Sequence, residues 1–156
     1  NYGPRQFPEK LIPLMIGKIT RGEGCPVYGD GQQIRDWIHV DDHNRGVLAV
    51  LESGQKGEVY NLGGDNELSN LQVLKDLGLA IGREPVLEFV VDRPGHDRRY
   101  AMNCAKVEAE LGWKAEVSWE AGLAQTVAWY AEQKDWLESI RSGAYQEYLQ
   151  ANYGAR

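Results

Sequence analysis

The sequence predicts an α/β fold, and three observations lead to this prediction. Strand-like runs alternate with segments of helical periodicity over the first two-thirds of the chain. The 156 residues are ordinary for one domain, and 42% hydrophobic with 26% charged residues is typical of a soluble globular protein. The expected strands are few and short, so we expect part of the sheet to lie in sequence that this chain lacks.

The first expected element is a buried helix. Apolar residues are dense over residues 11–19, and the segment ends near the arginine and glycine at 21–22. Pro13 leaves two alternatives for the start of this helix. It is either the first helical residue, with Lys10 and Leu11 extended, or a kink within the first turn.

Two extended segments and a second helix follow. Residues 26–28 form a short extended piece, and the Gly-Asp-Gly sequence at 29–31 predicts a tight hairpin turn. Residues 34–40 are the next strand candidate. Asp41 or Asp42 then caps a helix. Its expected inward face consists of Val47, Val50 and Leu51.

A third strand, a third helix and a fourth strand complete the alternation. Residues 58–62 are a strand candidate closed by the glycine pair at 63–64, which permits a close backbone approach or simply an exit turn. Ser69 or Asn70 caps the helix. A further strand at 86–91 runs directly into a polar loop. The buried side of the third helix is expected to contain Leu71, Leu74 and Leu77.

The remainder of the chain is expected to be mainly helical. Asn103 caps a short helix that ends at residues 111–112, and Ser118 opens a longer one. Gly143 separates this region from a last segment at 144–153. Residues expected to pack inward are Leu123, Val127, Tyr130, Ala131 and the tryptophans Trp119, Trp129 and Trp136.

The arginine loop, Asp92-Arg-Pro-Gly-His-Asp-Arg-Arg-Tyr100, holds three arginines and a histidine in a chain of formal net charge -6. Pro94 and Gly95 are turn residues, so the cluster is expected on a loop. A guanidinium group matches phosphate oxygens two at a time, which suggests a local anion site. The alternative is a solvated loop whose arginines pair with nearby acids.

Several classes of function have little support. No apolar run approaches the roughly 20 residues that cross a bilayer, and a pI of about 5.1 argues against nucleic acid as a partner. The N-terminus shows neither a signal pattern nor an initiator Met, so the chain is expected to come from a longer protein. Cys25 and Cys104 fit neither a disulfide framework nor a zinc site, and we expect both in a reducing, cytoplasmic setting.

No catalytic centre or metal site is recognisable from the residues. His39 and His43 are four apart, but one falls in a strand candidate and the other in a helix, so we expect structural roles and no bound metal. The chain contains no Gly-x-Ser-x-Gly, and a Tyr-x-x-x-Lys spacing occurs only at residues 130–134, in a segment expected to be a packed helix. The pattern alone therefore indicates an α/β domain that binds a phosphorylated small molecule.

Five blocks of sequence carry a resemblance that goes further. They are NYGPRQFPEKLIP at 1–13, PVYGDGQQIRDWIHVDD at 26–42, EVYNLGG at 58–64, the arginine loop, and the tail at 143–153. In this order they resemble the C-terminal part of dTDP-glucose 4,6-dehydratases, which are extended short-chain dehydrogenase/reductases. This chain looks shorter than the family between Leu71 and Glu88.

The resemblance implies that residues 1–156 are the nucleotide-sugar-binding portion of such an enzyme, without its NAD-binding Rossmann half. The family oxidises the sugar at C4, eliminates water across C5–C6 and returns the hydride to C6. The resemblance also implies a dTDP-sugar ligand, NAD as cofactor of the full-length enzyme, a homodimer of that enzyme, and no catalytic residue in this chain. We expect no turnover by this chain alone.

Residue by residue, the resemblance assigns one position beside NAD, Asn1. Lys10, Arg35 and Arg93 are expected to provide most of the affinity for the diphosphate, since a charge-assisted hydrogen bond contributes about 1.5–3 kcal/mol. The expected substrate-binding residues are Lys10, Leu11, Pro26, Val27, Tyr28, Arg35, Asn70, Asp92, Arg93, Pro94, Gly95, His96 and Tyr153.

Two other interpretations stay open at this point. The chain is either a non-catalytic binding fragment or part of a related UDP-sugar epimerase or decarboxylase. In all cases the strand at 58–62 and its preceding helix are expected to pack on the Rossmann sheet. We therefore expect the isolated chain to expose apolar surface and to self-associate.

Overall fold

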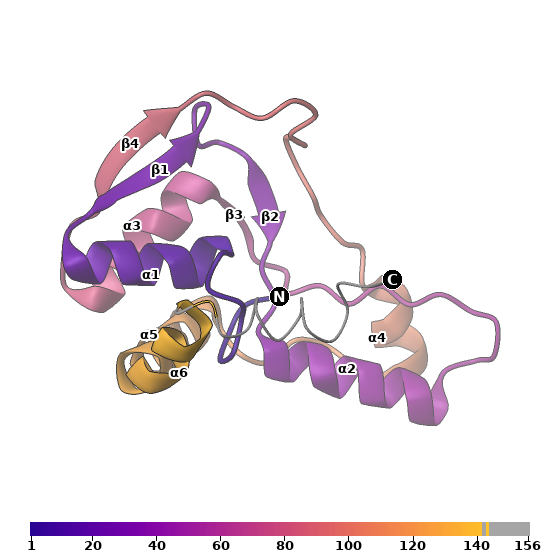
Figure 1. Ribbon diagram of the computed structural model, residues 1–156. Helices are drawn as coiled ribbons and strands as arrows, with labels where there is room; N and C mark the ends of the chain where they lie inside the picture. The colour runs from indigo at the N-terminus through magenta and orange to yellow at the C-terminus, as the bar shows by residue number, and fades with distance from the viewer. Residues whose placement is uncertain (142, 144–156) are drawn as a thin grey trace, which may run out of the picture.

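The computed structural model describes residues 1–141 and 143 and confirms an α/β arrangement (Figure 1). The tail segment at 144–153, including Tyr153, lies outside the described residues. Within the described part, the elements in chain order are α1 (Leu11–Arg21), β1 (Gly24–Tyr28), β2 (Ile34–Asp36), α2 (Val40–Ser53), β3 (Glu67–Ser69), α3 (Asn70–Ile81), β4 (Val86–Val90), α4 (Ala105–Leu111), α5 (Trp119–Glu132) and α6 (Lys134–Arg141).

Helix α1 begins two residues before its proline. Lys10 is the N-cap and Leu11 is already helical, so of the two alternatives for Pro13 the one that makes it the first helical residue is wrong. Proline is tolerated there because the amide groups of the first turn have no partner within the helix. The helix ends at Gly22, whose φ of 72° gives the left-handed C-cap that the sequence suggested.

The strands form two separate two-stranded sheets. β1 pairs with β4 in parallel, with Tyr28 opposite Val90, and β2 pairs with β3 antiparallel. The hairpin predicted at residues 29–31 is wrong, because β1 and β2 do not pair with each other. The turn itself exists, with positive φ at Gly29 and Gly31, but the Gly29 amide donates to the Val90 carbonyl at 2.9 Å. The turn is therefore joined to β4.

The second expected strand is shorter than predicted. β2 ends at Asp36, and the chain enters α2 already at Val40. The helix is capped by His39, whose Nδ1 accepts from the Asp41 amide, so the prediction of an aspartate cap is wrong. Beyond the end of β2, the backbone pairs with the N-terminal segment instead. The Tyr2 N–H donates to the Ile38 carbonyl, and the Val40 N–H donates to the Tyr2 carbonyl.

The predicted inward face of α2 is largely exposed. Val47 is 47% and Leu51 is 79% exposed, whereas the buried residues of this helix are Asp42 and Gly46. Residues 58–62 are extended but form no strand, because no neighbouring strand among the described residues completes a ladder. The periodicity of the sequence correctly identified which residues of α2 form an apolar stripe. It did not show that this chain leaves the stripe exposed and buries a different side of the helix.

The later helices largely follow the sequence. Ser69 caps α3 and Ser118 caps α5, each accepting a backbone N–H from the first turn. The N-cap of α4 is Cys104, although the predicted residue, Asn103, does accept the Ala105 amide at 3.0 Å. Gly112 closes α4 with a φ of 64°.

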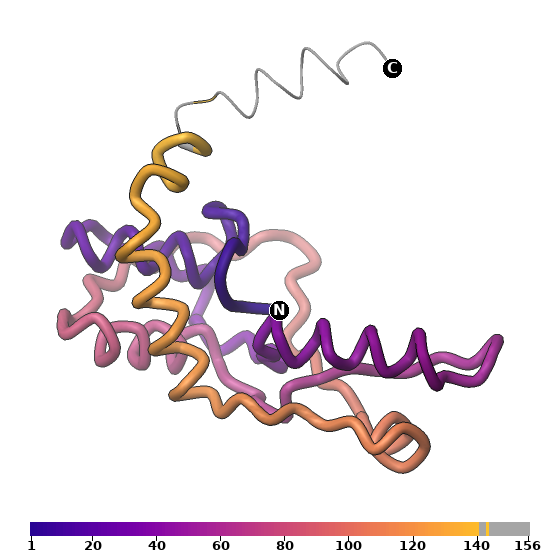
Figure 2. Tube along the Cα trace, turned by 90° about the horizontal axis from the view of Figure 1, so that it is seen from below, coloured from indigo at the N-terminus to yellow at the C-terminus, as the bar shows by residue number. Residues whose placement is uncertain are grey.

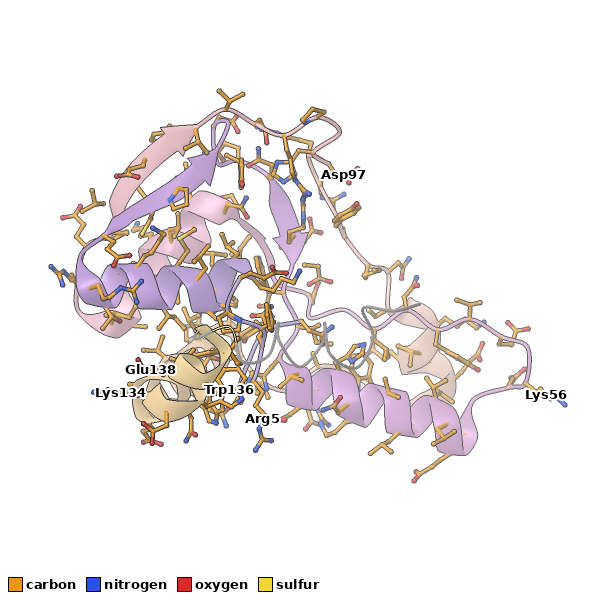
Figure 3. All side chains as sticks on the ribbon, in the orientation of Figure 1. Arg5, Lys56, Asp97, Lys134, Trp136 and Glu138 are labelled. Atoms are coloured by element: carbon orange, nitrogen blue, oxygen red, sulfur yellow. The ribbon has the colours of Figure 1, made fainter. Side chains whose placement is uncertain are left out.

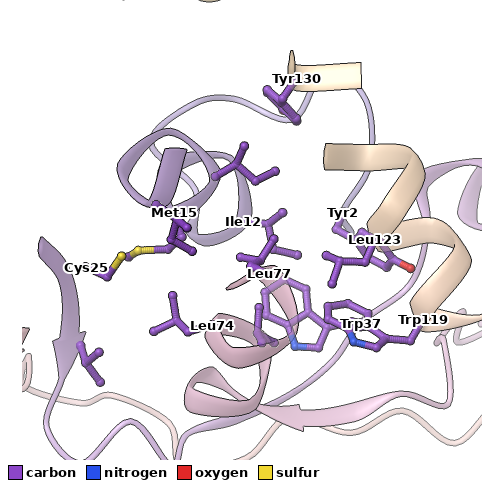
Figure 4. Packing of buried hydrophobic residues seen from close by; sticks show 14 residues of the cluster. Tyr2, Ile12, Met15, Cys25, Trp37, Leu74, Leu77, Trp119, Leu123 and Tyr130 are labelled. Carbon is purple, nitrogen blue, oxygen red and sulfur yellow. The ribbon is translucent and has the colours of Figure 1, made fainter. Parts of the chain in front are cut away.

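The interior consists of two clusters of buried side chains. The larger one joins α1, β1, α3 and α5 and includes Ile12, Leu74, Leu77 and Leu123, with the rings of Trp37 and Trp119 at one end (Figure 4). The smaller one contains Ile38, Val107 and Trp113. It lies under α2 and α4, which extend away from the other helices (Figure 2). Among the described residues, no helix is long and apolar enough to cross a membrane.

Candidate nucleotide-binding site

Several predicted site residues meet where the parallel strands β1 and β4 end. Tyr28 is the last residue of β1, and the arginine loop follows β4 and returns to β2 (Figure 3). Ligands of α/β proteins commonly bind beyond the carboxyl ends of parallel strands. Tyr28 is 48% exposed, whereas Val27 is buried in the core at 2%. Tyr28 is thus the residue of β1 that presents an aromatic side chain at this edge.

Asp92 anchors the start of the arginine loop through both carboxylate oxygens. Oδ1 lies 2.6 Å from His96 Nδ1 and accepts the Arg93 amide at 2.8 Å. Oδ2 accepts from Gln33 Nε2 at 2.9 Å. The pKa of Asp92 is lowered chiefly by the hydrogen bond with His96. This carboxylate therefore stays ionised and orients the loop.

Gln33 is a site residue that sequence reasoning missed. It is 2% exposed, and its amide connects Tyr28, Asp92 and Asn70. Asn70 also donates its backbone N–H to the Gln33 carbonyl at 3.1 Å. A glutamine between a glycine turn and a short strand gives no sequence signal of burial, because the contacts are made by residues far away in the chain.

Arg35 is held beside the loop by an aromatic ring. Its guanidinium carbon lies 4.6 Å from the centroid of the Tyr100 ring, a cation–π distance. It also donates to the Ile34 carbonyl at 2.6 Å, and among the described residues it forms no ion pair. The Tyr100 hydroxyl donates to Asp97, which raises the pKa of Tyr100, while Arg35 and Arg93 oppose this rise. Positive charge thus gathers around this ring.

Arg98 and Arg99, the last two arginines of the arginine loop, each pair with an acidic side chain. Arg98 binds Asp30 at 2.7 Å, and Arg99 makes a bidentate pair with Glu67 at 2.6 and 2.7 Å. These pairs lower the pKa of Asp30 and of Glu67. The interpretation of paired surface arginines is therefore correct for these two. They fix the loop against the turn after β1 and against β3.

Within the described part of the chain, Asn1, Lys10 and Leu11 form no hydrogen bond or ion pair with this cluster. Lys10 pairs with Glu9 at 3.1 Å and is 59% exposed, at the start of α1 with Leu11. Asn1 accepts a hydrogen bond on its backbone carbonyl from Gln6. Pro94 and Gly95 form the expected turn, with φ of 68° at Gly95. The structure thus brings together Tyr28, Arg35, Asn70 and the arginine loop.

Two cavities in the described part of the chain lie elsewhere. One, of about 810 Å³, lies between α1, α3, α5 and α6, and the other, of about 650 Å³, lies between α3 and β4. Neither is lined by a predicted site residue. We place the candidate site at the arginine loop because charged and aromatic groups converge there.

The turn after β1 does not have the geometry of a dinucleotide-binding turn. The glycine turn at 29–31 leads into strand β2 and not into a helix N-terminus, so it lacks the geometry that holds a dinucleotide pyrophosphate. Among the described residues, no cluster of three or more His, Cys, Asp or Glu side chains could hold a metal. Cys25 is buried and Cys104 partly buried, and burial raises the pKa of both thiols.

Comparison with known proteins identifies the family. A family model described as GDP-mannose 4,6 dehydratase matches residues 1–126. The chain belongs to this family. Within it, dTDP-glucose 4,6-dehydratase of Escherichia coli is 45% identical over 164 aligned positions, which cover all of this chain and 45% of that protein.

Two solved structures of the family are also similar. The dTDP-glucose 4,6-dehydratase of Bacillus anthracis, in complex with NAD, has a TM-score of 0.85 and 45% identity over 90% of this chain and 45% of its own. DesIV of Streptomyces venezuelae, a dTDP-glucose 4,6-dehydratase with NAD and TYD bound, has a TM-score of 0.87 and 45% identity over 90% and 44%. The chain therefore has part of the extended short-chain dehydrogenase/reductase fold and spans about half the length of these relatives.

Proposed function

We propose that this chain is the nucleotide-sugar-binding part of a dTDP-glucose 4,6-dehydratase. The observation that carries the proposal is the convergence of Tyr28, Arg35 and the arginine loop at one edge of the β1–β4 sheet. An exposed aromatic ring suits a nucleobase, and guanidinium groups without acid partners suit a diphosphate. The similarity to dTDP-glucose 4,6-dehydratases supports the choice of thymidine as nucleoside.

The proposed roles divide between recognition and orientation. Arg35 and Arg93 neutralise the diphosphate, while Arg98 and Arg99 hold the loop in place through their acid partners. NAD would supply hydride acceptance and return when bound by the remainder of the protein. Lys10, Leu11, Pro26, Val27, Asn70 and Tyr153 remain predicted contacts of the sugar nucleotide, and Asn1 a predicted neighbour of NAD. A cytoplasmic homodimer is the proposed state of the whole protein.

Titration calorimetry with dTDP and UDP tests the proposal on this chain. We expect dTDP to bind more tightly, because the sequence and the fold both resemble dTDP-sugar enzymes. Equal affinity for the two nucleotides would favour a UDP-sugar epimerase or decarboxylase. With dTDP-glucose and NAD added, we expect no 4-keto-6-deoxy product from the chain alone, and its appearance would refute the assignment of this part to binding without chemistry.

A further inference from the structure

Gln33 is a buried side chain with an unusually complete set of polar contacts. It lies between the glycine turn and β2, and it is 2% exposed in a region where the neighbouring Gln32 is exposed. Nε2 donates to the Tyr28 carbonyl at 3.3 Å and to Asp92 Oδ2 at 2.9 Å. Oε1 accepts from Asn70 Nδ2 at 3.4 Å. Both acceptors face the same nitrogen, which fixes the orientation of the amide.

Asp92, which Gln33 holds through Oδ2, contacts His96 through its other carboxylate oxygen. A carboxylate can only accept, so the 2.6 Å approach of His96 Nδ1 to Asp92 Oδ1 requires the proton on Nδ1. This leaves Nε2 as the nitrogen available to a ligand. The His96 ring meets the Tyr28 ring edge-on at a centroid distance of 6.3 Å. The position of Asp92 thus determines both the tautomer and the orientation of this imidazole.

We propose that Gln33 is a positioning residue of the nucleotide site, which holds Asp92 so that Asp92 fixes the tautomer and ring orientation of His96. Through its other contacts, the same amide holds the end of β1 and the first residue of α3 in register with the arginine loop. Gln33 is buried beneath these groups and acts through them. The ligand in this inference rests on the proposed function, while the effect on His96 does not.

The test compares two variants of Gln33 with a matched control. Gln33→Met keeps the length of the side chain but removes its hydrogen bonds, and Gln33→Glu keeps its shape but places a carboxylate against Asp92. Gln32→Met is the control at the adjacent exposed position. We expect Gln33→Met to weaken dTDP binding about tenfold, the effect of losing about 1.4 kcal/mol. The control should bind dTDP as the unmodified chain does.

A second readout separates positioning from folding. Nitrogen NMR of the histidine rings at neutral pH should show His96 as the Nδ1–H tautomer in the unmodified chain and as a mixture in Gln33→Met. Its signals are assigned by their loss in His96→Gln. In an Asp92→Ala background, adding Gln33→Met should not change the His96 signals further, because Gln33 acts on His96 through Asp92.

The outcomes distinguish this inference from the proposed function. Unchanged His96 signals and unchanged dTDP affinity in both Gln33 variants would overturn the positioning role. If the unmodified chain does not bind dTDP, the proposed function fails, and the NMR comparison alone decides the role of Gln33. If Gln33→Met does not fold, Gln33→Glu provides the same comparison at constant side-chain volume.

Discussion

The arginines of the candidate site differ in what their guanidinium groups contact. Arg98 and Arg99 are already bound to Asp30 and Glu67, whereas Arg35 rests on the ring of Tyr100 and has no acid partner among the described residues. An ion pair at the surface contributes little and occupies the donors that a phosphate would use. The number of arginines in a loop is therefore a poor measure of its capacity to bind anions.

Replacing Arg35 should remove affinity for the diphosphate. We expect Arg35→Ala to weaken dTDP binding about tenfold or more, because it loses charged hydrogen bonds worth about 1.5–3 kcal/mol. Binding of thymidine should be unaffected. The matched variant Arg98→Ala should change dTDP affinity less than about threefold, since its guanidinium is paired and exposed. Calorimetry on the two variants checks this, and equal losses would contradict the assignment.

Asp42 is a buried carboxylate that supports the fold outside the site. It is fully buried, and its Oδ2 accepts the amides of Glu116 and Val117 at 3.0 and 2.9 Å while Oδ1 binds Arg45. Although burial alone would raise its pKa, the hydrogen bonds from Arg45, Val117 and Glu116 outweigh burial and lower it. The folded chain therefore binds this proton more weakly than the unfolded chain does.

The stabilising effect of Asp42 should therefore depend on pH. It is fully present above the unfolded aspartate pKa of about 3.9 and is lost as the pH falls through the lower folded value. We expect Asp42→Asn to reduce the free energy of unfolding by about 3 kcal/mol at pH 7, because a buried charge network is broken. Urea titrations at pH 7 and pH 3 check this, and the difference between variant and unmodified chain should shrink at pH 3. A constant difference would contradict the linkage.

At the scale of elements, the sequence predicted best where local chemistry decides the structure. The serine caps of α3 and α5 and the glycine that ends α1 follow from side-chain and φ preferences of single residues. The predictions failed where contacts with another part of the chain decide the local structure. Residues 58–62 have the composition of a strand but no neighbouring strand within the described part of the chain. Helix α2 is capped by a histidine because its imidazole reaches the Asp41 amide. In the site, Gln33 was missed for the same reason.

The cap of α5 provides a direct test of this local control. Ser118 Oγ accepts the Ala121 amide at 3.3 Å. Ser118→Ala should lower the free energy of unfolding by about 1 kcal/mol, the usual cost of losing an N-cap. Ser53→Ala, at the exposed end of α2, serves as the control and should change stability by less than about 0.5 kcal/mol. Thermal unfolding measures both, and equal effects would show that the cap contributes nothing.

At the scale of the whole molecule, α2 carries an uncovered apolar surface. Val47, Leu48 and Leu51 are 47%, 54% and 79% exposed, and Val59 in the adjoining extended segment is 76% exposed. Lys56 marks the tip of this region, far from Asp97 in the arginine loop (Figure 3). Contiguous exposed apolar side chains usually mark a contact surface. This surface fits the prediction that α2 and residues 58–62 pack on another part of a longer protein.

We expect the isolated chain to self-associate through this surface. In sedimentation experiments, the double variant Leu48→Lys with Leu51→Glu should shift the chain toward monomer. Its thermal midpoint should not fall, because both side chains already lie in solvent. An unmodified chain that is monomeric and unfolds cooperatively would contradict the prediction.

The division of the interior into two clusters separates the surface that would recognise a ligand from the surface that would associate. β1, which ends at the candidate site, and α3 contribute side chains to the larger cluster, whereas α2 contributes Ala49 to the smaller one. Substitutions on the exposed face of α2 can therefore raise solubility without altering the proposed ligand site at the arginine loop. With the proposed function, redesigning α2 alone would turn this chain into a soluble sensor for sugar nucleotides.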